Sequence, residues 1–138
     1  MNVTRRQALG SIAITALTVT AVVVRTQTGY RLPPGSAVRT ALSLADYCIV
    51  HALAARICAA DEHGAVAPEQ VGVATFVDGF VAAMDAAERT DLQRLLQYIE
   101  HLAPLTRGRR SRFTELSPGQ QDAVLAALET HQIGRAHV

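Results

Sequence analysis

The sequence contains no tryptophan and no lysine, and only 4% of its 138 residues are aromatic. Charged residues are also scarce, at 18%, whereas apolar residues make up 49%. A core with so few rings must be built mainly from alanine, leucine and valine, a composition typical of helices. All 13 basic residues are arginine, and the net charge of +1 excludes a field over the whole surface that would attract nucleic acid.

Only two cysteines are present, Cys48 and Cys58. Ten residues of helix would separate them by about 15 Å, too far for a disulfide between them. Neither has a CxxC partner or a histidine at a metal-ligand spacing. We interpret both as small buried apolar residues, and the alternative is a bridge to another chain.

The length fits one small domain, and residues 1–31 differ too much from the rest to join its core. The domain is then residues 32–131. A chain of that size buries only somewhat over ~60% of its unfolded surface, which leaves no room for a cofactor-binding fold with a separate substrate domain. Large enzymes are excluded.

Residues 1–31 have the layout of an export signal. The paired Arg5 and Arg6 precede an uncharged run of 17 residues, Ala8–Val24, as in the n-region and h-region of a signal peptide. No clear cleavage site follows, and about 17 residues is the short limit of a membrane-spanning helix. The segment is therefore either a signal peptide or a retained anchor helix.

The pattern Thr4-Arg5-Arg6-x-x-Leu9 resembles the twin-arginine export motif. The residues on either side of Leu9 depart from the motif's usual Phe and Lys. We expect the twin-arginine machinery to recognise Arg5, Arg6 and Leu9, and the alternative is an ordinary secretory signal with a chance arginine pair.

The last seven residues, 132–138, look like the translated start of a common sequencing-library adapter. We therefore leave them out of the predicted fold and expect the native C-terminus to be missing. The alternative is a natural polar tail.

The middle of the chain predicts an all-α fold, a small bundle of about four helices behind the N-terminal signal or anchor helix. No segment alternates with a period of two, so we expect no sheet. The first helix is capped by Ser36 and ends near Ala60, before Asp61–Gly64. Its apolar positions are Val38, Leu42, Ala45, Ile49, Leu53, Ile57 and Ala60.

The second predicted helix starts near Pro68, and its glycines Gly72 and Gly79 are expected at close helix contacts. Its predicted core stripe is Val73, Phe76, Val77, Phe80, Val81 and Met84. The third helix is expected to stop before Pro104. Its core positions are Leu92, Leu95, Leu96, Ile99 and Leu102.

The fourth predicted helix begins at Ser117–Gln120, where Ser117 is the N-cap and Gln120 at N3 returns a hydrogen bond to it. Its core positions are Val124, Leu125 and Leu128.

Residues that carry chemistry are few. No phosphate-binding loop, nucleophile elbow or HExxH motif is present, so we expect no catalytic residue, cofactor site or metal site. Asp61–His63 could hold a cation, but consecutive residues rarely converge on one ion, and we interpret them as a soluble loop. His51 is interpreted as a core or interface histidine, and His101 as a cation at a helix C-terminus.

The one dense charge cluster consists of Arg107, Arg109, Arg110 and Arg112. Such a loop can bind phosphates or anionic lipid. No aromatic residues are interleaved to stack on bases, and export removes nucleic acid as a partner. The remaining interpretations are a solvated loop and a docking surface for an acidic patch of a partner protein.

Two stretches resemble the gluconate 2-dehydrogenase subunit 3 family: Gly72-Val73-x-x-Phe76-Val77-Asp78, and Phe113-x-x-Leu116-Ser117-Pro118-x-x-Gln121-x-x-x-Leu125-x-x-Leu128. The twin-arginine start also fits this family. Two features depart from it: Cys58-Ala59-Ala60 stands where a proline is usual, and the glycine- and aromatic-rich C-terminal segment is absent.

The resemblance implies a non-catalytic small subunit of an exported dehydrogenase complex, located in the periplasm or on the outer face of the cytoplasmic membrane. Its implied partners are a large subunit that holds FAD and a cytochrome c subunit that takes the electrons. The small subunit is expected to supply the export signal and to aid maturation of the flavoprotein. The alternative is a free-standing membrane-anchored helical interaction domain.

Overall fold

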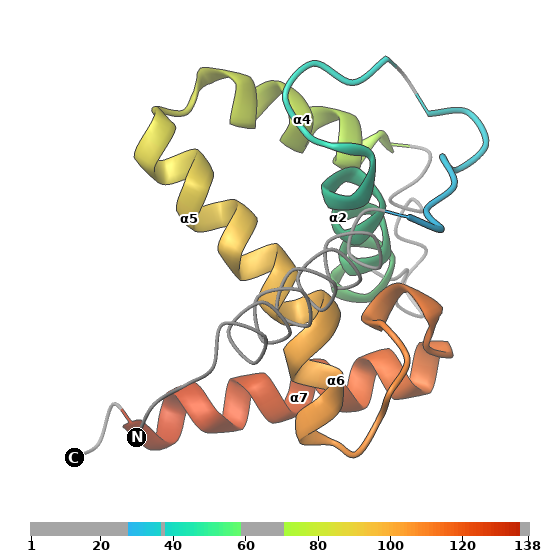
Figure 1. The fold of residues 1–138 in the computed structure, drawn as a ribbon, viewed down its shortest axis with the longest axis vertical. Coiled ribbons are helices and arrows are strands. Elements are labelled where there is room, and N and C mark those ends of the chain that lie inside the picture. Colours follow the sequence, from blue (N-terminus) through green and yellow to red (C-terminus); the bar gives the residue numbers. More distant parts are fainter. Residues whose placement is uncertain (1–27, 37, 59–70, 136–138) are drawn as a thin grey trace, which may run out of the picture. The chain divides into compact units, whose positions relative to one another are not determined.

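The computed structural model describes residues 28–36, 38–58 and 71–135, the last five as backbone only. The chain divides into two compact units, Met1–Arg31 and Leu32–Val138. All the helices described below belong to the second unit (Figure 1). No strand occurs among the described residues, which confirms the all-α prediction for them. The predicted N-terminal helix lies outside the described residues.

The first helix, α2, spans Leu44–Ile57 and is capped by Ser43, whose side chain accepts a hydrogen bond from the N–H of Asp46. The predicted start at Ser36 is wrong. Residues 40–42 cannot continue a helix because their N–H groups donate to the carboxylate of Asp78 on α4, at 2.6–3.0 Å. Ser36 instead closes a turn onto the carbonyl of Pro33.

Helix α4 spans Val73–Ala83, and the prediction of its buried face is right in part, because Val77, Val81 and Met84 pack on the core and the two phenylalanines do not. Its buried residues are Ala74, Asp78 and Val81, while Phe76 and Phe80 are 74% and 60% exposed. The predicted close contact at Gly79 is also wrong, because the space beside it is open. The predicted start at Pro68 lies outside the described residues.

Helix α5 spans Ala86–Gln97, and a π turn, η1 (Tyr98–Leu102), joins it to α6 (Ala103–Thr106). The helical path therefore passes Pro104, which corrects the predicted stop. A proline inside an α-helix clashes with the carbonyl four residues back and leaves it without a donor. Here the N–H of Ala103 reaches back five residues to Tyr98, and this wider turn accommodates the ring.

The last two elements are a 3-10 turn, η2 (Phe113–Glu115), and α7 (Pro118–Arg135). As predicted, α7 begins directly after Ser117, and the Ser117 N–H donates to the Gln120 side chain at 3.1 Å. The backbone of α7 continues through 132–135, and the adapter interpretation stays a prediction.

The core consists of two clusters that meet at Leu53 of α2. The first joins α2, α4 and α5 through the buried residues Leu42, Tyr47, Ile49, Val50, Ala74, Val81 and Leu96. The second joins η1, α6, η2 and α7 through Ile99, Ala103, Phe113, Leu116 and Val124. Helix α2 contacts members of both groups and lies at the centre of the unit (Figure 1).

Both cysteines are free thiols on α2 or at its end. Cys48 is buried as predicted, but Cys58 is exposed, which corrects the prediction for that residue. No helix among the described residues is long and apolar enough to cross a membrane.

Candidate docking surface

The arginine cluster divides into arginines that hold the fold and arginines that face solvent. Arg112 is paired with Glu115 at 2.6 Å, and its side chain is only 12% exposed. The guanidinium of Arg107 donates to the carbonyl of Ala123 on α7 at 3.3 Å. Arg109 and Arg110 are exposed. Of the four arginines predicted to dock a partner, Arg109 and Arg110 are therefore the most accessible, and Arg107 lies beside them.

The turn that presents these arginines is closed by backbone hydrogen bonds. The N–H groups of Arg107 and Arg109 both donate to the carbonyl of Pro104, and that of Gly108 donates to Leu105. Gly108 has φ +69°, a left-handed conformation that is strained for other residues. The turn thus has a defined shape although it is exposed.

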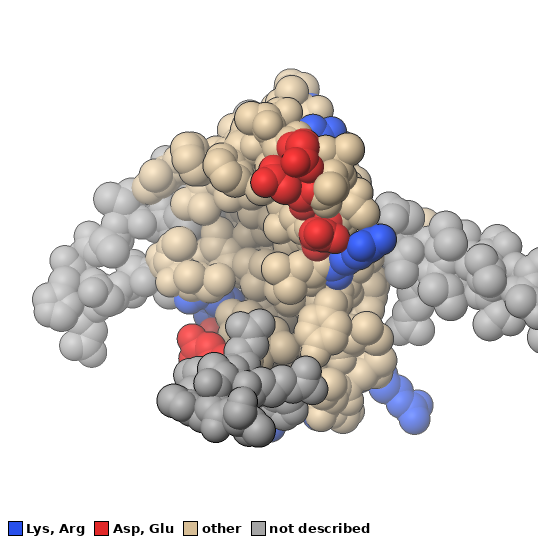
Figure 2. Space-filling view, turned by 90° about the vertical axis from the view of Figure 1, so that its left-hand side faces the viewer, with Lys and Arg blue, Asp and Glu red and all other residues tan. Residues whose placement is uncertain are grey.

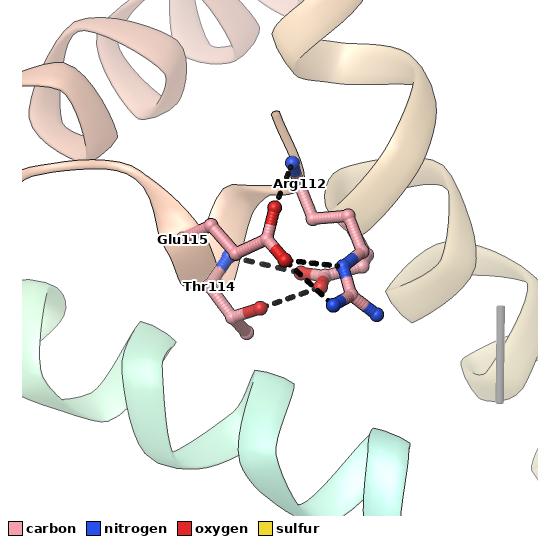
Figure 3. A network of polar contacts seen from close by, with 4 residues as sticks. Arg112, Thr114 and Glu115 are labelled. Atoms are coloured by element: carbon pink, nitrogen blue, oxygen red, sulfur yellow. Dashed lines mark hydrogen bonds and ion pairs between the residues drawn. The ribbon is translucent and has the colours of Figure 1, made fainter. Parts of the chain in front are cut away.

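A buried carboxylate of the π turn holds η2 in place through Thr114, which is labelled in Figure 3. Glu100 is fully buried and accepts hydrogen bonds from the Thr114 N–H at 3.1 Å and the Thr114 hydroxyl at 2.6 Å. Gln121 on α7 donates to the carbonyl of Phe113 at 3.0 Å. These bonds lock η2 between the π turn and α7.

An apolar groove of about 330 Å³ opens between the end of α2, the α5–η1 junction and α7. It is lined by Ile57, Leu95, Tyr98, Ile99, Leu125, Leu128 and Glu129. Ile57 is 72% exposed and Leu95 52%, although both were predicted to belong to the core. Figure 2, turned toward the left-hand side of Figure 1 where α5 lies, shows acidic and basic side chains gathered on part of this face beside a larger uncharged area. Exposed apolar side chains around a groove are typical of a site that a partner covers.

The described histidines His51 and His101 lie in different elements of the fold. His51 is half-buried and lines a small pocket of about 50 Å³ with Tyr47 and Thr75, whose hydroxyls lie 3.1 Å apart. His101 lies within the π turn, and the helical path continues beyond it, so it does not end the helix as predicted. Among the described residues, no three His, Cys, Asp or Glu side chains gather as metal ligands. Asp61–His63 lies outside them.

The family model for gluconate 2-dehydrogenase subunit 3 matches residues 45–137. The chain belongs to this family. The matched range covers more than half of the chain and includes every helix described above except the first residue of α2. No curated protein and no solved structure matches the chain.

Four residues that carried the resemblance to the gluconate 2-dehydrogenase subunit 3 family have structural roles in this fold, whereas Phe76 of the same motif is 74% exposed. Asp78 orders the segment before α2, Phe113 fills the second cluster, and Gln121 binds the carbonyl of Phe113. Gly72 precedes α4 with φ +69°, where a side chain would be strained. These residues thus have structural roles. Sequence reasoning did not identify the apolar groove, although Ile57, Leu95, Ile99, Leu125 and Leu128 of its lining were all predicted as core positions.

Arg5, Arg6 and Leu9, the predicted export residues, lie outside the described residues. Their role stays a prediction.

Proposed function

We propose that this chain is the non-catalytic small subunit of an exported, FAD-dependent dehydrogenase that oxidises gluconate or another sugar or alcohol. Its family, named as subunit 3 of a dehydrogenase, supports an accessory role. In this proposal the large subunit holds FAD, and a cytochrome c subunit accepts the electrons. The small subunit supplies the twin-arginine signal, aids flavoprotein maturation and accompanies its partner to the periplasm or the outer face of the membrane.

The observation that carries the proposal is the apolar groove together with the family match. Ile57, Leu95 and Tyr98 expose apolar surface around one groove. Each 100 Å² of such surface covered by a partner contributes about 2.5 kcal/mol. We therefore assign the groove to the large subunit, whose docking element is expected to be an apolar helix or ridge.

The test is co-purification of the small and large subunits expressed together. Leu95→Glu places a charge in the groove at a side chain that is already half exposed, so the fold is expected to survive. It should abolish co-purification and lower the yield of flavin-loaded large subunit. Ala87→Glu, on an exposed position of the same helix, is the matched control and should have no effect.

Purified alone, the small subunit should be colourless and inactive. A flavin spectrum in the isolated chain would overturn the non-catalytic assignment. Failure of the two subunits to associate under any condition would instead favour a free-standing interaction domain.

A further inference from the structure

A second exposed feature lies apart from the groove lining, at the end of α6. Two leucines, Leu102 and Leu105, are 52% and 53% exposed, and the turn after them carries Arg107, Arg109 and Arg110. From His101 to Thr114 the sequence contains no Asp or Glu. We call these five residues the basic tip.

The basic tip has a fixed shape. The three backbone hydrogen bonds onto Pro104 and Leu105 close the turn directly over the last residues of α6. The side chain of Arg107 holds the turn to α7 through Ala123. The backbone that carries the leucines and arginines is therefore already ordered, which lowers the entropic cost of binding. In Figure 1 this turn lies at an edge of the helical unit.

We propose that the basic tip binds the surface of a membrane that contains anionic phospholipid. The guanidinium groups of Arg109 and Arg110 would pair with lipid phosphates, and Leu102 and Leu105 would enter the boundary between headgroups and acyl chains. This inference goes beyond the proposed function and does not depend on the groove.

The size of the tip favours a lipid surface over a protein partner. A stable protein interface needs about 800 Å² on each side and some 20 residues. The basic tip offers five residues, and its charge is of one sign. A membrane can accept so small a tip because each basic residue near an anionic surface strengthens binding about fivefold, independently of a matched pocket.

The test must report contact at the tip itself and not binding of the whole chain, because the apolar segment of residues 8–24 would bind any vesicle. In the full chain carrying Cys58→Ser, Leu105→Cys is labelled with an environment-sensitive fluorophore, while Cys48 stays buried. Vesicles are prepared from brominated phosphatidylcholine alone and from brominated phosphatidylcholine mixed with brominated phosphatidylglycerol. We expect quenching of the label only in the vesicles that contain phosphatidylglycerol, and none for the same label at Ala87→Cys, near the far end of α5.

The arginine dependence distinguishes this binding from simple apolar adsorption. Arg109→Gln with Arg110→Gln should lower the equilibrium constant for contact between the tip and the surface about thirtyfold, measured as the ratio of quenched to unquenched label on vesicle-bound chains, and the lysine pair should largely restore it. Arg94→Gln, an exposed arginine on α5, is the single-charge control and should change little.

Three results would overturn the proposal: no quenching at position 105, quenching by brominated phosphatidylcholine to the same extent, or quenching unchanged in the glutamine pair. Protection of the label by an acidic polypeptide without any response to phosphatidylglycerol would assign the tip to a protein partner instead. Each of these results leaves the co-purification of the two subunits unaffected, so the proposed function is tested separately.

Discussion

Asp78 is a buried carboxylate on α4 that accepts hydrogen bonds from the N–H groups of residues 40–42, more than 30 residues earlier in the chain. Burial raises the pKa of Asp78, but hydrogen bonds from the backbone N–H groups of Leu42, Thr40 and Ala41 and from the Thr40 side chain outweigh it and lower the pKa to about 2. These donors prefer the charged carboxylate, so ionisation of Asp78 stabilises the fold.

Because the pKa of Asp78 is lower in the folded state than in the unfolded chain, its contribution is present above about pH 4 and is lost as the pH falls toward 2. Asp78→Asn should lower the free energy of unfolding at neutral pH by about 1–3 kcal/mol, because an amide cannot accept all three N–H bonds. Denaturant unfolding at pH 7 and pH 3 measures this.

The difference between wild type and Asp78→Asn should shrink in acid. Asp91→Asn is the control, since its ion pair with Arg94 is exposed and contributes at most about 1 kcal/mol. A difference that is the same at both pH values would show that Asp78 acts by its shape alone.

At the scale of elements, the π turn η1 has two roles: it lets the helical path pass Pro104, and it holds η2 in place. It places Glu100 with a fully buried carboxylate against the start of η2, where Thr114 donates two hydrogen bonds. A buried charge is tolerated only when its acceptor sites are filled, so the loss of one donor is costly.

Thr114→Val keeps the shape of the side chain but removes the hydroxyl donor at 2.6 Å from Glu100. It should lower the free energy of unfolding by about 2 kcal/mol, whereas Thr114→Ser, which keeps the hydroxyl, should cost less than about 1 kcal/mol. Thr90→Val, which removes an exposed hydroxyl bonded within its own helix, is the matched control. Equal losses for the valine and serine variants at position 114 would contradict this role of the hydroxyl.

For the whole molecule, we propose that export determines where the chain meets the large subunit. The twin-arginine receptor recognises the arginine pair itself and not positive charge in general. Arg5→Lys with Arg6→Lys should therefore retain the chain in the cytoplasm, together with any large subunit that depends on it. Fractionation with an antibody to the mature domain measures the outcome.

Arg25→Lys is the control, because it makes the same chemical change after the apolar run. Export of the double variant at the normal rate, or export of the wild type in cells without the twin-arginine pathway, would exclude this signal.

Much of the helical content followed from the sequence because it depends on local chemistry. The start of α7 was predictable, since Ser117 and Gln120 form their hydrogen bond within four residues of each other. The apolar positions Val124, Leu125 and Leu128 of α7 were also correct. Family membership was recognisable for a related reason, because residues such as Phe113 and Gln121 occur at a fixed spacing in the chain.

Only the tertiary structure decided which apolar faces are covered and where helices begin and end against distant groups. Helix α2 starts at Leu44 and not near Ser36, because the carboxylate of Asp78 takes the preceding N–H groups. Phe80 and Leu95 fit a helical stripe as well as Val81 and Leu96 do, yet the first two are exposed and the last two are buried. The spacing of apolar residues does not show which neighbouring helices cover them. The sequence by itself therefore determined the class, the family and the local caps. The exposed groove depends on contacts between residues far apart in the chain, which the periodicity of any one helix does not contain.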